Sequence, residues 1–334
     1  MSDVLAEINE LHTYFYTEEG VVKSVNGVSF RVHEGQTVAI VGESGCGKSV
    51  TALSLMGLVE EPSGRLAGGE IWFDGRDLAK ASRKELERLR GNELSMIFQE
   101  PMSALNPVLT IGEQLTEPLI EHLHLSKKEA LKRAEELVTR VGIPRAKEIL
   151  KSYPHELSGG MLQRVMIAMA VSCSPKLLIA DEPTTALDVT IQAQILDLLL
   201  TMKAETGMAI LLITHDLGVV AETADYVVVM YAGKVVEQGT ALSLFQNPKH
   251  PYTKGLLNSR PVLGHRKKRL YSIPGQVPNP LQLGQGCHFS DRCEQCLDIC
   301  REKQPELKAY DGEHLAACWL YEEEEELVPN ARIG

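Results

Sequence analysis

The sequence predicts an α/β fold, with a mostly parallel sheet that carries helices on its faces and is interrupted by a helical segment. Short apolar runs alternate with helix-compatible segments along most of the chain, as in a parallel sheet with covering helices. A long stretch with helical periodicity, from about residue 111 to 173, separates two groups of these runs. Beyond about Gln246 prolines punctuate the chain, and five of its seven cysteines gather between residues 287 and 318.

Length and composition narrow the class of protein. The 334 residues suggest one large domain with appendages. Hydrophobic residues make up 44% and charged residues 24%, which is ordinary for a globular protein. Aromatic residues make up only 5%, the net charge is −11, and no basic stripe is present. A protein that binds nucleic acid is therefore not expected.

No segment of the sequence predicts a membrane span or a signal peptide. The longest apolar runs, residues 209–213 and 226–231, are far shorter than the roughly 20 residues that cross a bilayer. The first ten residues, MSDVLAEINE, are acidic and lack a basic start and an apolar core. We expect the protein to stay in the cytosol, with any membrane link running through a partner.

The first strands lie in the N-terminal part of the chain. Residues 24–32 (SVNGVSFRV) are rich in β-branched residues, and residues 37–41 (TVAIV) form a short buried run that ends in glycine. Residues 68–75 (GGEIWFDG) have glycine at both ends of an apolar run, as expected of a hairpin strand.

The helical segment follows, and after it predicted strands again alternate with helices. Ser126 and Glu129 form a capping box, and helical periodicity continues from there to Val141. Three further strands and one helix are then predicted, the strands at 177–180, 209–214 and 226–231 and the helix at 190–205. The proline-rich stretches 247–252 and 273–280 predict no long regular element.

Residues 42–49 (GESGCGKS) match the phosphate-loop pattern G-x4-G-K-[ST] at every fixed position. An apolar strand precedes the loop and a helix-compatible run follows it, whereas an ordinary glycine-rich turn needs neither. Backbone N–H groups and the helix N-terminus favour phosphate oxygens, Lys48 would reach the β- and γ-phosphates, and Ser49 would ligate Mg²⁺. The candidate ATP-binding residues of the loop are Gly42, Glu43, Ser44, Gly45, Cys46, Gly47, Lys48, Ser49 and Val50.

Cys46 stands at this helix N-terminus beside Lys48. Both the helix dipole and the ammonium group favour a thiolate, so the sequence predicts a reactive cysteine that nucleotide would protect from alkylation. The alternative is an inert small residue.

An apolar strand that ends in two carboxylates supplies the second element, at residues 177–182 (LLIADE). In nucleotide hydrolases the aspartate at such a strand end holds Mg²⁺, usually through water, which is the role expected of Asp181. Glu182 can orient or deprotonate the attacking water. An acidic pair at a strand end is common. Together with the phosphate loop, however, it indicates a nucleotide hydrolase.

Between these two elements, residues 157–164 (LSGGMLQR) resemble the LSGGQ signature of ABC-type ATPases, with Met161 where many members carry glutamine. The resemblance covers roughly residues 1–245, and Ala186 to Asp188 resembles its D-loop. It implies a P-loop NTPase fold with an antiparallel β subdomain and a helical signature subdomain at about 100–173. It also implies Gln99 and His215 as catalytic residues beside Glu182, and Mg²⁺ held by Ser49, Gln99 and Asp181.

The same resemblance implies how ATP is bound. Phe15, or less favourably Tyr16, would stack on adenine. Two ATPase domains would pack head to tail, because the signature of one chain lies too far from its own phosphate loop. Each would present its signature and D-loop residues to the nucleotide of the other: Ser158, Gly159, Gly160, Gln163 and Asp188.

Residues 96–107, 245–253 and 286–293 resemble the ATPase subunits of dipeptide, oligopeptide and nickel importers. That resemblance implies a partner ATPase subunit, two transmembrane permease subunits and an extracellular substrate-binding protein, with this chain on the cytoplasmic face of the membrane. Peptide import is the main interpretation and nickel import the alternative. Two less favoured functions are a soluble ABC ATPase that acts on nucleic acid and a regulatory protein that binds ATP without hydrolysing it.

The clustered cysteines have the spacing Cys287-x5-Cys293-x2-Cys296-x3-Cys300-x17-Cys318. Four thiolates on irregular backbone suit either tetrahedral Zn²⁺, through the Cys293/Cys296 pair, or an iron–sulfur cluster. In the similar importers the pattern uses all but Cys296, which implies a [4Fe–4S] cluster on Cys287, Cys293, Cys300 and Cys318. We accordingly divide the chain into an ATPase domain (1–245), a proline-rich linker (246–283), an irregular Cys-rich metal module (284–320) and an acidic tail (321–334).

Overall fold

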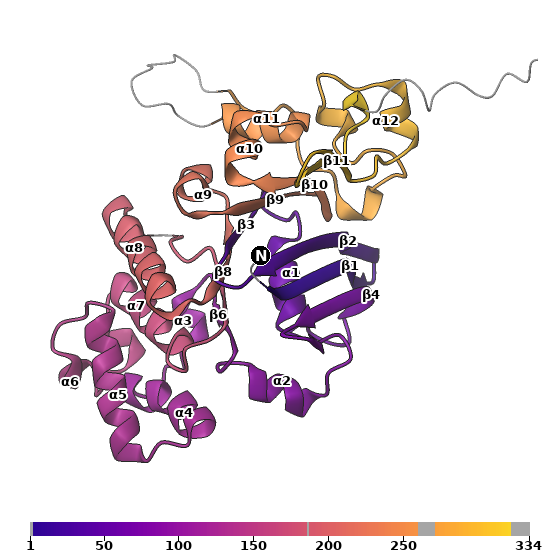
Figure 1. Ribbon diagram of the computed structural model, residues 1–334. Coiled ribbons are helices and arrows are strands. Elements are labelled where there is room, and N and C mark those ends of the chain that lie inside the picture. Colours follow the sequence, from indigo (N-terminus) through magenta and orange to yellow (C-terminus); the bar gives the residue numbers. More distant parts are fainter. Residues whose placement is uncertain (1–2, 186, 260–270, 322–334) are drawn as a thin grey trace, which may run out of the picture.

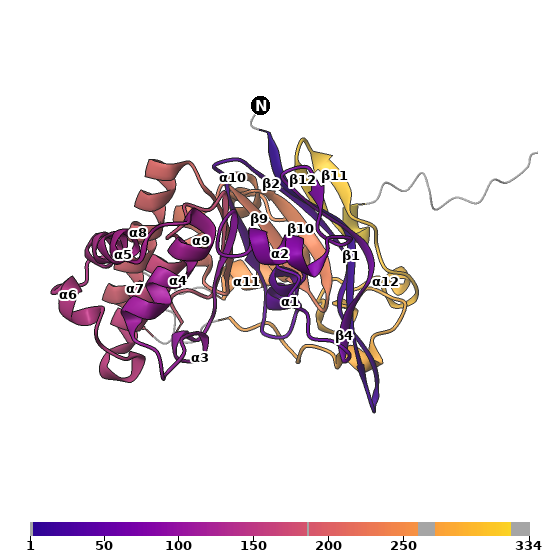
Figure 2. The same cartoon turned by 90° about the horizontal axis from the view of Figure 1, so that it is seen from below.

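The computed structural model describes residues 3–185, 187–259 and 271–321. Their strands form a four-stranded sheet of order β2-β1-β4-β5 and an eight-stranded sheet of order β11-β12-β10-β9-β3-β8-β7-β6. Figures 1 and 2 both show the four-stranded sheet and the group of helices α4 to α7 on opposite sides of the molecule. Among the described helices none is both long and apolar enough to cross a membrane.

The smaller sheet is antiparallel and is built from β1 (Val4–Thr17), β2 (Gly20–His33), β4 (Gly64–Phe73) and β5 (Arg76–Asp77). Strand β1 pairs with β2 on one side and with β4 on the other, and β5 pairs with the outer side of β4. One face of β1 packs on helix α1 (Lys48–Leu55), where Thr13 Oγ1 lies 2.7 Å from Ser54 Oγ. The long β1 itself was not predicted.

The larger sheet has a parallel centre formed by β6 (Leu94–Ile97), β7 (Leu177–Asp181), β8 (Ala209–Thr214), β3 (Thr37–Val41) and β9 (Tyr226–Tyr231). Every residue of β3, β7 and β8 is buried, because helices or the smaller sheet cover both faces. The predicted bounds of β3, β8 and β9 are confirmed. The next strand, β10 (Lys234–Thr240), runs antiparallel to β9.

The helical subdomain expected at about 100–173 contains five α-helices: α3 (Pro101–Ala104), α4 (Ile111–Leu123), α5 (Lys127–Arg140), α6 (Ala146–Ile149) and α7 (Gly159–Ala170). Capping boxes begin two of them, the expected one at Ser126 and another at Thr110. Their apolar residues share one core with α8 (Val189–Thr206) and one face of β7 and β8. Helices α2 (Arg83–Leu89) and α9 (Leu217–Thr223) lie outside this group.

The C-terminal part is more regular than its prolines and cysteines predict. Helix α10 (Ala241–Gln246) precedes α11 (Pro251–Asn258), whose first residue is a proline, so Pro251 begins a helix instead of interrupting one. After α12 (Asp298–Glu302) the strands β11 (Lys308–Asp311) and β12 (His314–Ala316) form a hairpin. Since β12 pairs with β10, the segment expected to be irregular extends the larger sheet by two strands.

A buried carboxylate ties this C-terminal part to the sheet. Glu237 on β10 is fully buried and accepts hydrogen bonds from the backbone N–H groups of Lys249 and His250, at 2.6 and 2.9 Å. Its Oε1 also lies 2.7 Å from His314 Nε2 on β12. A buried carboxylate with several partners is stable only while they stay in place, so these contacts fix the C-terminal part on the sheet.

Candidate nucleotide site

The predicted phosphate loop connects β3 to α1. Gly42 has φ 155°, and a Cβ there would lie 2.2 Å from the Met230 carbonyl oxygen. Gly47 has φ 103°, and a Cβ there would lie 2.2 Å from the Ser24 carbonyl oxygen. Only glycine fits either position. The Lys48 side chain is buried, and its Nζ donates to the carbonyl oxygens of Gly42 and Glu43 at 2.8 and 3.1 Å, which holds the loop closed around it.

The expectation of a reactive Cys46 thiolate is wrong. The side chain is buried, 1% exposed, and faces the core between the two sheets. Burial raises the pKa of the Cys46 thiol, and the nearby Lys48 charge offsets this only in part. The structure thus favours the alternative of an inert small residue, because desolvation of a thiolate outweighs the helix N-terminus and the lysine.

The two predicted oxygen ligands meet beside the loop. Asp181 is the last residue of β7, and its Oδ1 accepts a hydrogen bond from Ser49 Oγ at 3.1 Å. Burial raises the pKa of Asp181, whereas the Ser49 hydrogen bond and the Lys48 charge act in the opposite direction. Neighbouring hydroxyl and carboxylate oxygens are donors that Mg²⁺ prefers, so this pair fits the expected ion.

Glu182 follows directly, with φ 46°, and contacts side chains from its own loop and from two other segments. Its Oε2 accepts hydrogen bonds from Gln99 Nε2 (3.0 Å) and Thr185 Oγ1 (2.8 Å), and its Oε1 lies 3.3 Å from His215 Nδ1. Burial raises its pKa, but the hydrogen bonds from Thr185 and His215 outweigh burial, so the pKa lies below the usual value. Glu182 is therefore a carboxylate near neutral pH. Thr185 was missed by the sequence analysis, although it stands three residues beyond the glutamate.

The signature residues lie elsewhere. Ser158 caps α7, its Oγ accepting from the Met161 N–H at 3.4 Å, and both Ser158 and Gly159 are exposed. Figures 1 and 2 both show α7 on the far side of the sheet from α1. Gln163 is only 2% exposed and so does not present itself to a partner in this conformation. Gly160, the other predicted donor, is half-buried in the first turn.

In the expected D-loop, Asp188 is exposed and caps α8 by accepting from the Ile191 N–H at 3.0 Å. Ala186 lies outside the described residues.

The two candidate aromatics face opposite sides of β1. Phe15 lies on the same side as Thr13, which contacts α1, and its ring packs so tightly on Gly64 that a Cβ there would lie 2.6 Å from it. Tyr16 points the other way, and the Arg65 guanidinium lies 4.1 Å from its ring centroid. Phe15 thus lies on the face toward α1 and the phosphate loop.

The four cysteines expected as cluster ligands, Cys287, Cys293, Cys300 and Cys318, line one small pocket, and Cys296 is not among its lining residues. Burial, with smaller effects from neighbouring cysteines, raises the pKa of Cys287 to about 12 and that of Cys318 to about 11. In the described parts of the chain no group of histidine, cysteine and acidic residues has the arrangement of a bound metal. His288 and His314 face other partners, the Ala232 carbonyl oxygen and Glu237.

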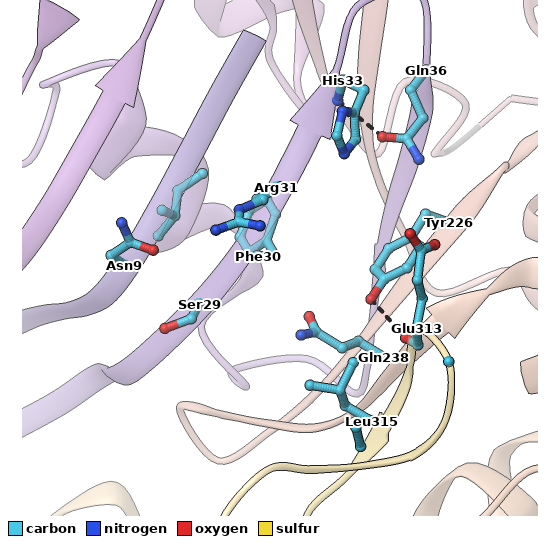
Figure 3. Close-up of a pocket in the computed structure, with 13 residues that line it drawn as sticks. Asn9, Ser29, Phe30, Arg31, His33, Gln36, Tyr226, Gln238, Glu313 and Leu315 are labelled. Carbon is cyan, nitrogen blue, oxygen red and sulfur yellow. Dashed lines mark hydrogen bonds between the residues drawn. The ribbon is translucent and has the colours of Figure 1, made fainter. Parts of the chain in front are cut away.

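A separate cavity of about 710 Å³ lies away from all these residues, between β2, β9, β10 and the β11–β12 hairpin. Figure 3 shows its polar lining, including Gln36, Tyr226 and Gln238, and the hydrogen bond from Tyr226 to the Glu313 carbonyl oxygen. It contains no residue of the phosphate loop or the acidic strand end, so it is distinct from the nucleotide site.

A phosphate loop between a buried strand and a helix, beside an acidic strand end on a parallel sheet, defines a nucleotide-binding domain of the P-loop class. Comparison with protein families matches residues 25–185 to the ABC transporter family. Residues 236–300 match the C-terminal region of oligopeptide/dipeptide transporters.

Similar proteins extend over nearly the whole chain. The oligopeptide transport ATP-binding protein AppD of Bacillus subtilis is 54% identical over 96% of this chain and 98% of its own. The dipeptide transport ATP-binding protein DppD of the same organism is 50% identical over 98% and 97%. Among solved structures, the dimeric post-hydrolysis state of the ATP-binding cassette MJ0796 with ADP and Pi has a TM-score of 0.64 and 27% identity. It covers 71% of this chain and 98% of its own. The chain belongs to the ATP-binding subunits of ABC transporters and is an ATPase.

Proposed function

We propose that this chain powers the import of di- and oligopeptides by hydrolysing ATP. The convergence of Ser49, Asp181 and Glu182 beside the phosphate loop carries the hydrolytic part of the proposal. The cargo is inferred from the similarity to peptide-transport ATPases, which includes the C-terminal region. Nickel import stays the alternative cargo.

Each residue then has a defined task. The loop N–H groups and Lys48 would bind the phosphates, and Ser49 and Asp181, with Gln99, would hold Mg²⁺, which would neutralise charge during phosphoryl transfer. Glu182 accepts a proton from water while the water oxygen bonds to the γ-phosphorus and the bond to ADP breaks. His215 keeps the Glu182 carboxylate oriented. ADP and phosphate are the products.

A second ATPase chain completes the site. Ser158, Gly159 and Asp188 are exposed, so they are available to the nucleotide of a partner chain packed head to tail. Phe15 is the proposed adenine-stacking residue, since it lies on the α1 face of β1. Two permease subunits and an extracellular binding protein would complete the importer, with this chain bound peripherally on the inner face of the membrane.

Uptake tests the proposal directly. The assembled transporter in proteoliposomes should accumulate labelled di- or oligopeptides with ATP hydrolysis, and Glu182→Gln should stop both. Accumulation of Ni²⁺ in place of peptide would shift the cargo to the alternative. Hydrolysis without any coupled uptake would contradict the transport role.

For the Cys-rich segment we propose a [4Fe–4S] cluster on Cys287, Cys293, Cys300 and Cys318. Four thiols around one pocket are the donor set of such a cluster. Burial raises the pKa values of Cys287 and Cys318, so a bound cluster would have to compensate the charge of their thiolates. Zinc through the Cys293/Cys296 pair remains the competing proposal, although Cys296 does not line the pocket.

Metal analysis separates the two. Protein purified without oxygen should carry about four iron and four sulfide per chain. Cys300→Ser should remove or destabilise the cluster, while Cys296→Ser should leave it intact. Stoichiometric zinc with no sulfide, lost in Cys296→Ser, would establish the zinc site instead.

A further inference from the structure

The Cys-rich segment reaches into the phosphate loop through one side chain. Arg292 Nη1 and Nη2 donate to Glu43 Oε2 and Oε1 at 2.6 and 3.0 Å. The two residues are 249 positions apart in the sequence. A bidentate guanidinium–carboxylate pair fixes both the distance and the orientation of its partners, so this contact can define the position of Glu43.

Glu43 is held at its backbone as well. Its N–H donates to Tyr252 Oη at 2.8 Å, and its carbonyl oxygen accepts from Lys48 Nζ at 3.1 Å. Tyr252 and Arg292 both belong to the C-terminal part, whereas Lys48 is the phosphate-binding lysine of the loop. The second residue of the phosphate loop is therefore placed by contacts from outside the loop, and it in turn places Lys48.

Burial and several hydrogen bonds hold the Arg292 side chain in one position. Its side chain is only 5% exposed, Nε donates to the Pro274 carbonyl oxygen at 2.8 Å, and Nη1 lies 3.3 Å from Tyr231 Oη. The hydrogen bonds to Glu43 are the largest cause that raises its pKa, so the charge is permanent. Burying a guanidinium is costly unless every donor has a partner, which makes this arrangement specific and not a loose surface pair.

The backbone that carries Arg292 is the turn between two pocket cysteines. The Ser290 N–H donates to the Cys287 carbonyl oxygen (2.9 Å), and the Cys293 N–H donates to the Ser290 carbonyl oxygen (3.3 Å). Arg292 lies within these consecutive turns, directly before Cys293. A displacement of the cysteines is thus transmitted to the guanidinium with little flexible chain between them.

We propose that Arg292 is a positioning residue for ATP, which sets the conformation of the phosphate loop through Glu43 and so couples nucleotide affinity to the integrity of the Cys287–Cys293 turn. This inference rests on the proposed ATPase function and adds a residue outside the nucleotide motifs to it. Arg292 acts on the nucleotide through Glu43 and does not reach the phosphates itself.

The two partners predict different mutant behaviour. Glu43 is already 31% exposed beside Arg292, so without Arg292 its side chain can turn into water, and the loop loses this contact while the fold keeps no buried unpaired charge. Without Glu43, the guanidinium stays buried and unpaired, which destabilises the C-terminal part as a whole. Arg292→Met therefore tests the contact with Glu43 selectively. Arg292→Lys keeps the positive charge but cannot form the bidentate hydrogen bonds.

The experiment measures Mg-ATP affinity of the full chain by calorimetry, and KM and kcat in the assembled transporter. Arg292→Met should raise the Kd and KM for ATP about tenfold, equivalent to about 1.4 kcal/mol, with kcat changed by less than about twofold. Arg292→Lys should give a smaller increase. Arg301→Met is the matched control from the same segment, because Arg301 is exposed and only loosely paired, and it should leave the Kd unchanged. Hydrogen exchange of residues 42–48 should be faster in Arg292→Met and, to a smaller extent, in Arg292→Lys, and unchanged in Arg301→Met.

A purely structural role would lower the unfolding temperature and leave the Kd and the exchange of the loop as in the wild type, which would overturn the proposal. If Arg292→Met does not fold, Arg292→Lys decides: a wild-type Kd with wild-type exchange of the loop rejects the coupling. Failure of the ATPase function itself is recognised separately, since the wild type would then bind no Mg-ATP, or Lys48→Ala would bind it equally well.

Discussion

Replacing Glu182 by glutamine isolates one property of the site, its ability to accept a proton. The amide oxygen can occupy the position of Oε2 and accept from Gln99 and Thr185, as the carboxylate does at 3.0 and 2.8 Å. The amide NH₂ then faces His215 Nδ1, which can accept in its other tautomer. The hydrogen-bond network is thereby preserved, so any loss of rate reports the missing base.

The size of the effect follows from the role. A positioned general base contributes about 10²- to 10⁴-fold, or about 2.7–5.4 kcal/mol of transition-state stabilisation. Lys48 and Ser49 are untouched by the substitution, so the binding of Mg-ATP should stay close to that of the wild type. Removal of a negative charge beside the γ-phosphate even favours nucleotide binding slightly.

Phosphate release by the assembled transporter is the appropriate assay, with Mg-ATP binding measured on the same preparation. The expected result is wild-type affinity with hydrolysis by this chain's site reduced at least about 100-fold. Glu222→Gln, at an exposed glutamate on α9, is the matched control and should hydrolyse normally. Near wild-type hydrolysis in Glu182→Gln would refute the assignment of Glu182 as the base.

Three further perturbations test other parts of the structure. Lys48→Ala should abolish Mg-ATP binding that is measurable by calorimetry. Wild-type Mg-ATP affinity in this variant would contradict the role of Lys48 on the phosphates. Cys46 should react with alkylating reagents only as fast as the chain unfolds, with or without nucleotide; rapid labelling of the folded chain, followed by mass spectrometry, would show that burial does not protect it. Burial lowers the pKa of His250 from 6.5 to about 3, so the unfolded chain binds an extra proton between these values. Stability is then full above pH 6.5 and should fall by up to about 1.4 kcal/mol per unit as the pH drops toward 3. His250→Asn, which keeps an N-cap acceptor for α11, should show a shallower decline in denaturant titrations, and an equal slope would reject the assignment.

Much of the fold could be predicted because its signals are local. Strands β3, β8 and β9 are continuous apolar runs between turn residues, and the capping box at Ser126 lies within four residues of sequence. The phosphate loop is equally local, since its glycines and Lys48 are contiguous. Gln99 and His215 were found only through family resemblance, because the distance in sequence between them and Glu182 hides their hydrogen bonds.

What the sequence could not predict depends on contacts between distant segments. Cys46 has the sequence neighbours of a reactive thiol, and only the packing of the two sheets buries it. The strands β11 and β12 have weak local patterns and exist because β10 offers an open edge. Arg292 is one of many arginines in the sequence, and its partner Glu43 is identifiable only when the fold brings them together.

These contacts bear on where the ATPase domain ends. The nucleotide motifs all precede residue 245, and the sequence predicts a boundary there. Glu237, however, has its hydrogen-bond partners in the backbone of Lys249 and His250 and in His314, all beyond that boundary. Glu43 in the phosphate loop likewise depends on Tyr252 and Arg292. A buried carboxylate on the sheet and the second residue of the loop both lose their partners without the C-terminal part. We infer that the motifs mark where the chemistry is encoded, while the contacts of Glu237 and Glu43 favour a folding unit that extends through the Cys-rich segment to β12.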